Sequence, residues 1–327
     1  MRNIRRVAGR LWDNKQYISG EELGKELAIS RTAVWKQIRA MQDEGFVIDA
    51  RPGLGYRLIS CPDKLLPFLV EKQLNTSVIG RNIYYYSSVD STNSVASDLA
   101  GKGSADGSVV ITEEQAGGKG RFGRHWVSPR QTNILISIIL RPNLLPHQVP
   151  RLAMLGAVSV ADSIRKLTGL EIRLKWPNEI LLQEKKVGGI LTEFNAEMDK
   201  VDFVILGIGI NVNFDLSEFQ GLSTLATSLS HEAGAKISRL ELLQILLEEV
   251  DTNYKILFGE GLTRLVERWN TICWGSGEEV EVDSGEGKRG GILKRIDENG
   301  RLVIAGVDTE QVFAVGEGVS LSRAVVR

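Results

Sequence analysis

The sequence predicts a multidomain α+β protein with three consecutive parts. The first sixty residues show three short amphipathic helical patterns and a hairpin pattern, whereas the middle of the chain alternates strands and helices. From Gly277 onward the sequence changes to short alternating strands joined by Gly-rich turns. A chain of 327 residues with 43% hydrophobic composition is long enough for two or three domains with separate cores. We place the domain boundaries at 1–62, 63–272 and 273–327.

The N-terminal part has the pattern of a winged helix-turn-helix. Ser19 begins a short second helix, Ser30 caps a third, and residues 46–59 form a hairpin that would be the wing. Apolar residues at helical spacing mark the expected buried faces: Ile4, Val7, Ala8 and Leu11 on the first helix, and Val34, Ile38 and Met41 on the third. The outer face of the third helix carries five candidate DNA contacts, Arg31, Thr32, Trp35, Lys36 and Arg39.

In a helix-turn-helix the second helix of the pair enters the major groove of DNA. We therefore expect the three cations to contact phosphate, and Thr32 and Trp35 to approach base edges. Residues 1–60 carry a net charge of about +4 and the rest of the chain about −5, which indicates one confined DNA-contacting domain. The alternative is a three-helix interaction domain whose charges are merely solvated.

Other composition features narrow the class of protein. Cys61 and Cys273 lie far apart in the sequence, which predicts neither a disulfide framework nor a zinc site. The histidines are scattered singly, so we expect no metal cluster. No signal-peptide pattern follows Met1 and no apolar run has membrane-spanning length. We expect a cytoplasmic protein with no membrane partner.

A glycine-rich basic loop, residues 117–126, lies near the middle of the chain between strand patterns at 109–112 and 134–140. Its four glycines in seven positions leave the backbone free to take positive φ and to approach a ligand closely. The loop also contains three cations close to these glycines in the sequence, Lys119, Arg121 and Arg124. Backbone amides beside Lys and Arg indicate a loop that holds phosphate or carboxylate.

Other glycine-rich motifs fit this loop less well. Gly118, Gly120 and Gly123 satisfy the dinucleotide pattern G-x-G-x-x-G, but a strand and not a helix follows them. The Gly-Lys-Ser/Thr ending of a Walker loop is absent from the sequence, as are the His-Arg-Asp and Asp-Phe-Gly partners of a kinase glycine loop. Taken alone, the loop could still be a solvated basic surface loop.

Local signals place the elements before and after the loop. Ser91, Thr92 and Asn93 follow a strand at 83–87, and they would cap a helix. Pro150 begins a long helix of core residues.

Further along, Lys185 and Lys186 are expected in a hairpin-like turn, where a lysine pair is usually solvated. Residues 204–211 form a buried strand whose glycines allow close backbone approach. Ser238 opens an amphipathic helix that ends near Gly259.

Five motifs occur in a fixed order along the chain. They are Asp-Ser-Thr-Asn at 90–93, Gln115 with the glycine-arginine loop, Lys-Trp-Pro-Asn at 175–178, Lys-Val-Gly-Gly-Ile-Leu-Thr-Glu at 186–193 and Gly-Ile-Gly-Ile-Asn at 207–211. This series resembles the biotin protein ligases. The N-terminal extension makes the chain similar to the bifunctional bacterial type, which also represses the biotin operon.

The resemblance implies a central mixed α/β catalytic domain resembling class II aminoacyl-tRNA synthetases, and a C-terminal SH3-like β-barrel. It implies that biotin is activated with ATP and Mg²⁺ to biotinyl-5′-AMP. Biotin would then pass to a lysine of a carrier protein, such as the biotin carrier domain of acetyl-CoA carboxylase. The family binds operator DNA and forms a homodimer when biotinyl-AMP is bound.

The resemblance also assigns residues to the site, with Lys186 and Arg121 as catalytic residues. The implied biotin contacts are Ser91, Thr92, Asn93, Gln115, Lys119, Gly120, Arg121 and Lys186. The implied nucleotide contacts are Arg124, Trp126, Lys175, Asn178 and Asn211. Magnesium travels with ATP near Asn178, so no metal site belonging to the protein itself is expected.

Two positions depart from the family pattern. Lys119 stands where the family has arginine, which keeps the charge but loses the planar bidentate fork. Glu179 stands where the family has aspartate, which lengthens the side chain by one methylene near the expected metal region. These departures favour a rival hypothesis, a biotin-sensing repressor that has lost catalysis, whereas Arg121, Asn178 and Lys186 match the family and favour an enzyme. A lipoate ligase of the same fold is a second rival, disfavoured because such enzymes generally lack the N-terminal module.

Overall fold

The computed structural model describes residues 2–14, 16–197, 200–216, 224–284, 287–306, 309–315 and 319–324. The chain divides into two compact units, Met1–Lys64 and Leu65–Arg327. Each unit is described by itself. The larger unit contains both the central part and the C-terminal part, and the boundary between these two at residue 272 stays a prediction.

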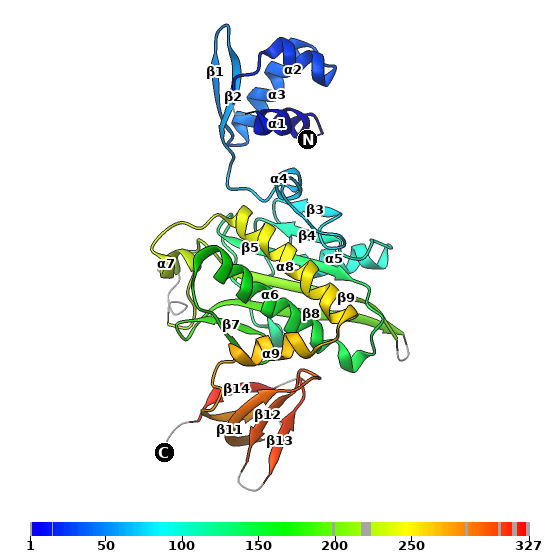
Figure 1. Ribbon diagram of the computed structural model, residues 1–327, viewed down its shortest axis with the longest axis vertical. Helices are drawn as coiled ribbons and strands as arrows, with labels where there is room; N and C mark the ends of the chain where they lie inside the picture. Colours follow the sequence, from blue (N-terminus) through cyan, green and yellow to red (C-terminus); the bar gives the residue numbers. More distant parts are fainter. Residues whose placement is uncertain are drawn as a thin grey trace. The chain divides into compact units, whose positions relative to one another are not determined.

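The N-terminal unit contains three helices and a two-stranded antiparallel sheet (Figure 1). The elements are α1 (Arg2–Asp13), α2 (Gly20–Leu27), α3 (Arg31–Asp43), β1 (Val47–Arg51) and β2 (Gly55–Ser60). The two predicted caps are confirmed, because the Ser19 side chain accepts from the backbone N–H of Glu22 and the Ser30 side chain from that of Ala33. The predicted apolar faces of α1 and α3 are buried, while the side chain of Ile4 lies outside the described residues.

The larger unit is built on a seven-stranded mixed sheet in the order β3-β4-β5-β9-β8-β7-β6. Its strands are β3 (Ile83–Tyr86), β4 (Val109–Thr112), β5 (Asn133–Leu140), β6 (Arg173–Lys175), β7 (Glu179–Leu182), β8 (Lys185–Glu197) and β9 (Lys200–Asn211). The first two strands pair in parallel and the others are antiparallel. The buried strand predicted at 134–140 is β5, and all of its residues are buried.

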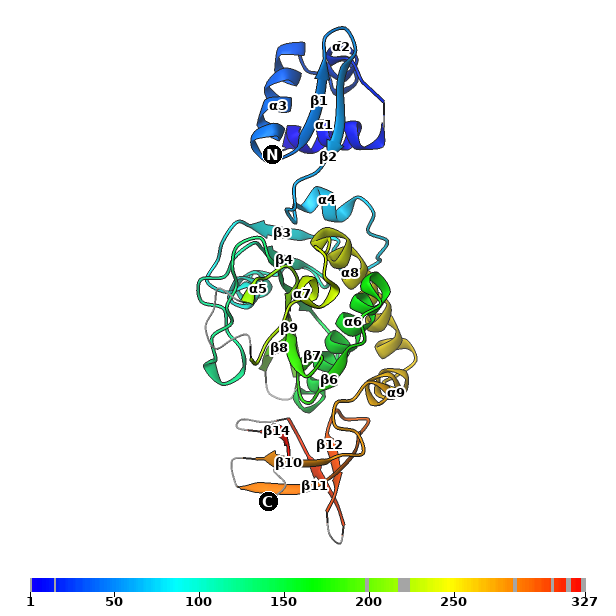
Figure 2. The same ribbon diagram turned by 90° about the vertical axis from the view of Figure 1, so that its left-hand side faces the viewer.

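Helices cover both faces of this sheet, as Figure 2 shows. One face packs against α6 (Pro150–Thr168) and α8 (Arg239–Gly259), whose leucines, valines and isoleucines form the main core with β5 and β9. The other face carries α5 (Thr92–Gly101) and a smaller apolar cluster around Phe203. The remaining helical segments are α4 (Pro67–Glu71), α7 (Leu229–Ala233), α9 (Thr263–Thr271), and the 3₁₀ turns η1 (Arg121–Gly123) and η2 (Pro146–Gln148).

The C-terminal part forms a five-stranded antiparallel sheet in the order β13-β12-β11-β10-β14. Its strands are β10 (Glu279–Asp283), β11 (Lys288–Ile296), β12 (Leu302–Ala305), β13 (Glu310–Phe313) and β14 (Ser320–Arg323). The sequence predicts short alternating strands in this part, but the pattern does not reveal β14, because the only buried residue of this strand is Leu321 and it shows no apolar run. The indole N–H of Trp176 donates to the backbone oxygen of Gly300 at 3.0 Å, which joins this sheet to the central part.

Candidate functional site

A cavity of about 630 Å³ opens on the α5-bearing side of the seven-stranded sheet, a volume within the usual range for small-molecule sites. All thirteen residues that the sequence assigned to biotin or nucleotide line this cavity. They come from the start of α5, the glycine-arginine loop with Gln115 before it, the end of β6 and the turn that follows it, β8 and the end of β9. The five motifs, which are spread over 122 residues of sequence, are therefore brought to one place by the sheet order.

One end of the cavity is a buried network of neutral polar side chains. The backbone N–H and the hydroxyl of Thr92 both donate to Oε1 of Gln115, at 2.8 and 3.0 Å. The hydroxyl of Ser137 lies 2.8 Å from Oγ1 of Thr92 and 2.6 Å from Oδ1 of Asn93. Asn93 also donates to Glu193 at 2.6 Å. This end offers several oriented donors and acceptors to a neutral polar ligand group.

The capping role predicted for Ser91, Thr92 and Asn93 is wrong. Ser91 occupies the cap position of α5, but its side chain makes no cap hydrogen bond, and the two following side chains bond to Gln115 and Glu193. Sequence patterns gave no separate role to Ser137 or Glu193, although both hold side chains of this end in place. Both act through residues about 45 to 100 positions away, which no local pattern shows.

Glycines of β9 form the floor beneath these side chains. A Cβ placed on Gly207 would lie 2.3 Å from Oδ1 of Asn93, and one on Gly209 would lie 2.9 Å from the ring of Trp126. The close backbone approach predicted for this strand is therefore confirmed.

The glycine-arginine loop folds back on itself over the cavity. The backbone N–H of Trp126 donates to the oxygen of Gly118 at 2.9 Å, and that of Gly120 donates to Arg124 at 2.7 Å. Among the four loop glycines only Gly123 has positive φ, at 68°, so the predicted use of positive φ applies to one of them. Gly118 serves close approach instead, because a Cβ there would lie 2.7 Å from the backbone oxygen of Trp126.

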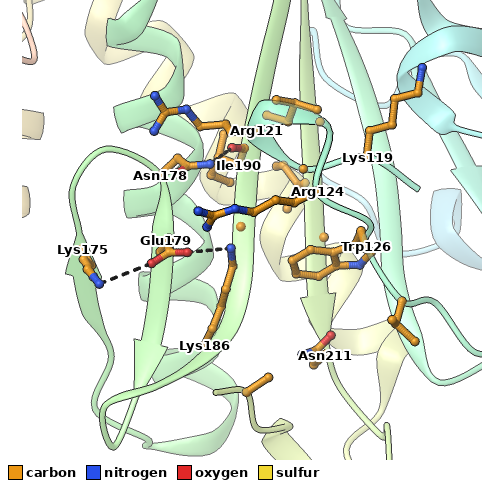
Figure 3. A pocket seen from close by; sticks show the side chains of 18 of the residues that line it. Lys119, Arg121, Arg124, Trp126, Lys175, Asn178, Glu179, Lys186, Ile190 and Asn211 are labelled. Atoms are coloured by element: carbon orange, nitrogen blue, oxygen red, sulfur yellow. Dashed lines mark hydrogen bonds and ion pairs between the residues drawn. The ribbon is translucent and has the colours of Figure 1, made fainter. Parts of the chain in front are cut away.

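The other end of the cavity is cationic and contains one carboxylate. Lys186 donates to Glu179 at 2.8 Å, and Nζ of Lys175 lies 3.8 Å from the second oxygen of the same carboxylate. Figure 3 shows Arg121 and Arg124 extending toward this region and Lys119 pointing away from it. Burial acts to raise the pKa of Glu179, but the charge and hydrogen bond of Lys186 and the charge of Lys175 outweigh it, so the pKa lies below its usual value.

Arg121 lies at the junction between the loop and the C-terminal part. Its guanidinium is half-buried and donates to the backbone oxygen of Val319 at 3.5 Å. Burial lowers the pKa of Arg121 from its ordinary value, although a guanidinium stays charged at any physiological pH. The C-terminal part also contributes Trp274, Ser320 and Leu321 to the cavity wall, a contribution that the sequence analysis missed.

Two side-chain amides of the site are held in fixed directions. Asn178 donates to the backbone oxygen of Ile190 at 2.7 Å, and Asn211 donates to that of Thr227 at 3.1 Å. The predicted turn position of Lys186 is wrong, because Gln183 and Glu184, both with positive φ, form the turn and Lys186 lies in β8.

The candidate DNA contacts lie on the exposed face of α3. Arg31, Thr32, Trp35, Lys36 and Arg39 are all exposed. Trp35 is 49% exposed, and the guanidinium of Arg39 lies over its ring at 5.7 Å. The half-exposed indole and the cations around it lie together on one face of α3.

Three expectations from composition concern metal clusters, disulfides and membrane-spanning segments. Within the described ranges no cluster of three or more His, Cys, Asp or Glu side chains is arranged to hold a metal ion. Neither Cys61 nor Cys273, both among the described residues, forms a disulfide, and burial raises the pKa of the Cys273 thiol to about 12. Over the same part of the chain, every helix is too short or too polar to cross a bilayer.

Two family models match this chain and define its class. The model of the biotin/lipoate A/B protein ligase family matches residues 85–211, and an HTH domain model matches residues 5–57. The ligase match runs from β3 to the end of β9, which is the sheet that carries the cavity.

Relatives that match most of this chain identify the family within that class. The bifunctional ligase/repressor BirA of Bacillus subtilis is 37% identical over 88% of this chain and 89% of its own length. The BirA protein of Escherichia coli is 31% identical over 89% of each chain. The biotin protein ligase of Aquifex aeolicus in complex with biotin and ATP has a TM-score of 0.65 and 30% identity, over 75% of this chain and all of that one. The chain belongs to the family of bifunctional biotin ligase/repressor proteins.

Proposed function

We propose that the cavity joins biotin to the AMP part of ATP and then transfers biotin to a carrier protein. In the first step an oxygen of the biotin carboxylate attacks the α-phosphorus of ATP, the bond to the β-phosphate oxygen breaks, and pyrophosphate leaves. In the second step the neutral amine of a carrier lysine attacks the carbonyl carbon of biotinyl-5′-AMP. An amide bond forms, the bond to AMP breaks, and the amine loses a proton.

The neutral polar end of the cavity is the proposed seat of the biotin ring. A ureido group carries two N–H donors and one carbonyl acceptor, and it is uncharged. Ser91, Thr92, Asn93 and Gln115, which line this end, supply both donors and acceptors and are themselves uncharged, and the Glu193 carboxylate that accepts from Asn93 does not line the cavity. The fixed orientation of these groups by Ser137 and Glu193 lowers the cost of ordering them on binding.

The cationic end is the proposed seat of the reacting carboxylate and phosphates. Lys186 and Arg121 would stabilise the negative charge that gathers on the α-phosphate and carboxylate as they react. The observation that carries the proposal is the Glu179 carboxylate bridging Lys186 and Lys175. It supports an anion site at this end, since one carboxylate already lies between two of its cations.

Arg124, Trp126 and the amides of Asn178 and Asn211 are the proposed contacts of the nucleotide. Lys119 and Gly120 belong to the loop that would close over biotin. The side-chain oxygens of Asn178 and Glu179 fit the oxygen ligands that Mg²⁺ prefers. When bound with ATP, the ion would neutralise phosphate charge.

The finer architecture belongs to the same proposal. The mixed sheet with helices on both faces fits a catalytic domain resembling class II aminoacyl-tRNA synthetases, and the five short strands fit an SH3-like module. The contact of Val319 with Arg121 supports a role for that module in closing the cavity. A cytoplasmic location goes with this function.

Repression is the second half of the proposed function. The exposed face of α3 would contact operator DNA, with Arg31, Lys36 and Arg39 on phosphates and Thr32 and Trp35 at base edges. We propose that the chain binds DNA as a homodimer that forms when biotinyl-AMP is bound. Occupancy of the cavity would then set the level of repression.

Label transfer tests the enzymatic proposal directly. The protein is mixed with Mg-ATP, a biotin carrier domain and radiolabelled biotin, or radiolabelled lipoate in a parallel reaction. The expected result is transfer of biotin alone, and no transfer to a carrier whose target lysine is replaced by arginine. Transfer of lipoate would make the chain a lipoate ligase. Adenylate formation without transfer would make it a biotin sensor, the rival that Lys119 and Glu179 favour.

A further inference from the structure

A buried ion pair joins the start of α8 to the end of β4 and has no part in the proposed chemistry. Arg239, the first residue of α8, donates to Glu113 at 2.8 Å, and the two side chains are 0% and 1% exposed. Removing two charges from water costs more than packing apolar side chains of the same size. Stabilisation of the fold is therefore a weak explanation for this buried ion pair. The contacts of the two side chains suggest another role.

The pair joins the two ends of the segment that carries the ligand loop. Glu113 follows β4, and its backbone oxygen accepts from the N–H of Gln131 at 3.0 Å. Arg239 also donates to the backbone oxygen of Asn133, the first residue of β5, at 3.0 Å. Residues 114–132 leave and rejoin the sheet at this point, and they include Gln115 and the whole glycine-arginine loop.

The same carboxylate holds the first residue of the larger unit. Oε1 of Glu113 accepts from the buried backbone N–H of Leu65 at 2.8 Å and from the hydroxyl of Tyr85 at 3.4 Å. Leu65 is the first residue after the N-terminal unit, which ends at Lys64. Glu113 thus lies two residues from Gln115, a proposed biotin contact, and one hydrogen bond from the chain that leads to the DNA-binding unit.

We infer that Glu113 and Arg239 are positioning residues that couple closure of the ligand loop to the chain at Leu65, an inference that rests on the proposed function. When biotin and ATP draw residues 114–132 over the cavity, the movement is transmitted to the residues at the two ends of this segment. The surrounding interior is close-packed, so a shift of the ends moves the Glu113 carboxylate and its bond to Leu65.

Hydrogen–deuterium exchange at the Leu65 amide tests the inference on the full chain. In the unaltered protein, addition of biotin and Mg-ATP should slow exchange at Leu65 roughly five- to hundredfold, the usual range of coupling between sites. In Glu113→Gln, which keeps the shape of the side chain, the ligand should change this rate less than about twofold. Biotin-dependent pyrophosphate release should persist in the variant. Equal slowing in both proteins, or none in the unaltered protein, would overturn the inference.

Asp162→Asn is the matched control, because it breaks another ion pair of the larger unit, with Arg268 at 2.5 Å between α6 and α9. In Asp162→Asn, biotin and Mg-ATP should slow exchange at the Leu65 amide as much as in the unaltered protein. If Glu113→Gln fails to fold, the double variant Glu113→Gln/Arg239→Met removes both charges and should show the same loss of ligand response. Failure of pyrophosphate release in the unaltered protein contradicts the proposed function. Normal release with a ligand-independent Leu65 amide contradicts only this inference.

Discussion

The two units use their cations in opposite ways. On α3 the side chains of Arg31, Lys36 and Arg39 lie in water on a convex face. In the cavity, Lys186 and Lys175 share the Glu179 carboxylate.

This difference matches the two anions that the family handles. DNA is a long polyanion that releases counterions along its length, so solvated charges on an outer face suffice. A single carboxylate or phosphate group needs charges fixed in direction and shielded from water. The Glu179 carboxylate fixes the direction of the two cavity lysines. The predictions below test this contrast.

The largest effect is expected at Lys186. Replacement by methionine removes the charge nearest the proposed reacting groups, so kcat for pyrophosphate release should fall by about 10²- to 10³-fold. The neighbouring Lys185, which does not line the cavity, is the control, and Lys185→Met should change kcat less than about twofold. Equal losses in both variants would show that the effect is not specific to the site.

Salt dependence should separate the outer cations from the inner ones. Lys36→Ala and Arg39→Ala should each reduce the slope of log affinity for duplex DNA against log salt by about 0.9, because each removes one phosphate contact. Fluorescence anisotropy over a salt series measures the slope. Lys294→Ala removes an exposed charge on the C-terminal sheet and should leave the slope unchanged. Unchanged slopes in all three variants would exclude this face of α3 from DNA contact.

Two serines at helix starts should behave differently. Ser30 caps α3, so Ser30→Ala should lower the free energy of unfolding of the N-terminal unit by about 1 kcal/mol and leave ligation unchanged. Ser91 makes no cap hydrogen bond, so Ser91→Ala should raise the KM for biotin with little loss of stability. Denaturant titration and steady-state kinetics measure both. An equal loss of stability in Ser91→Ala and Ser30→Ala would indicate that Ser91 does cap α5.

The smallest effect concerns pH and Glu179. Its folded pKa lies below the ordinary value of 4.5, so the group contributes stability above pH 4.5 that is lost as pH falls through the folded pKa. Glu179→Gln should therefore lower the free energy of unfolding at pH 7, by less than about 1 kcal/mol for a partly exposed pair. The difference between the two proteins should vanish at acid pH. A difference that grows on acidification would mean that the lysines do not stabilise this carboxylate.

Sequence predicted the elements and the site residues that depend on local or ordered signals. Ser19 and Ser30 were identified as caps because a cap and its partner lie three residues apart. Five short motifs in fixed order located every assigned residue of the cavity.

The missed features depend on contacts between distant residues. Ser91 looks like a cap in sequence, and only the approach of Gln115 to α5 shows that this end of the helix belongs to the cavity. Arg239 lies 126 residues from Glu113, and each residue alone is an ordinary helix or strand-end charge. The contact of Val319 with Arg121 joins parts 198 residues apart, and β14 itself carries no apolar run.

Native mass spectrometry tests the central claim most directly. The protein is incubated with biotin and Mg-ATP and examined for a non-covalent complex with the mass of biotinyl-5′-AMP. We predict one adenylate per chain in the unaltered protein and none in Lys186→Met. No adduct in the unaltered protein, or an equal amount in the variant, would contradict a cavity that uses Lys186 to activate biotin.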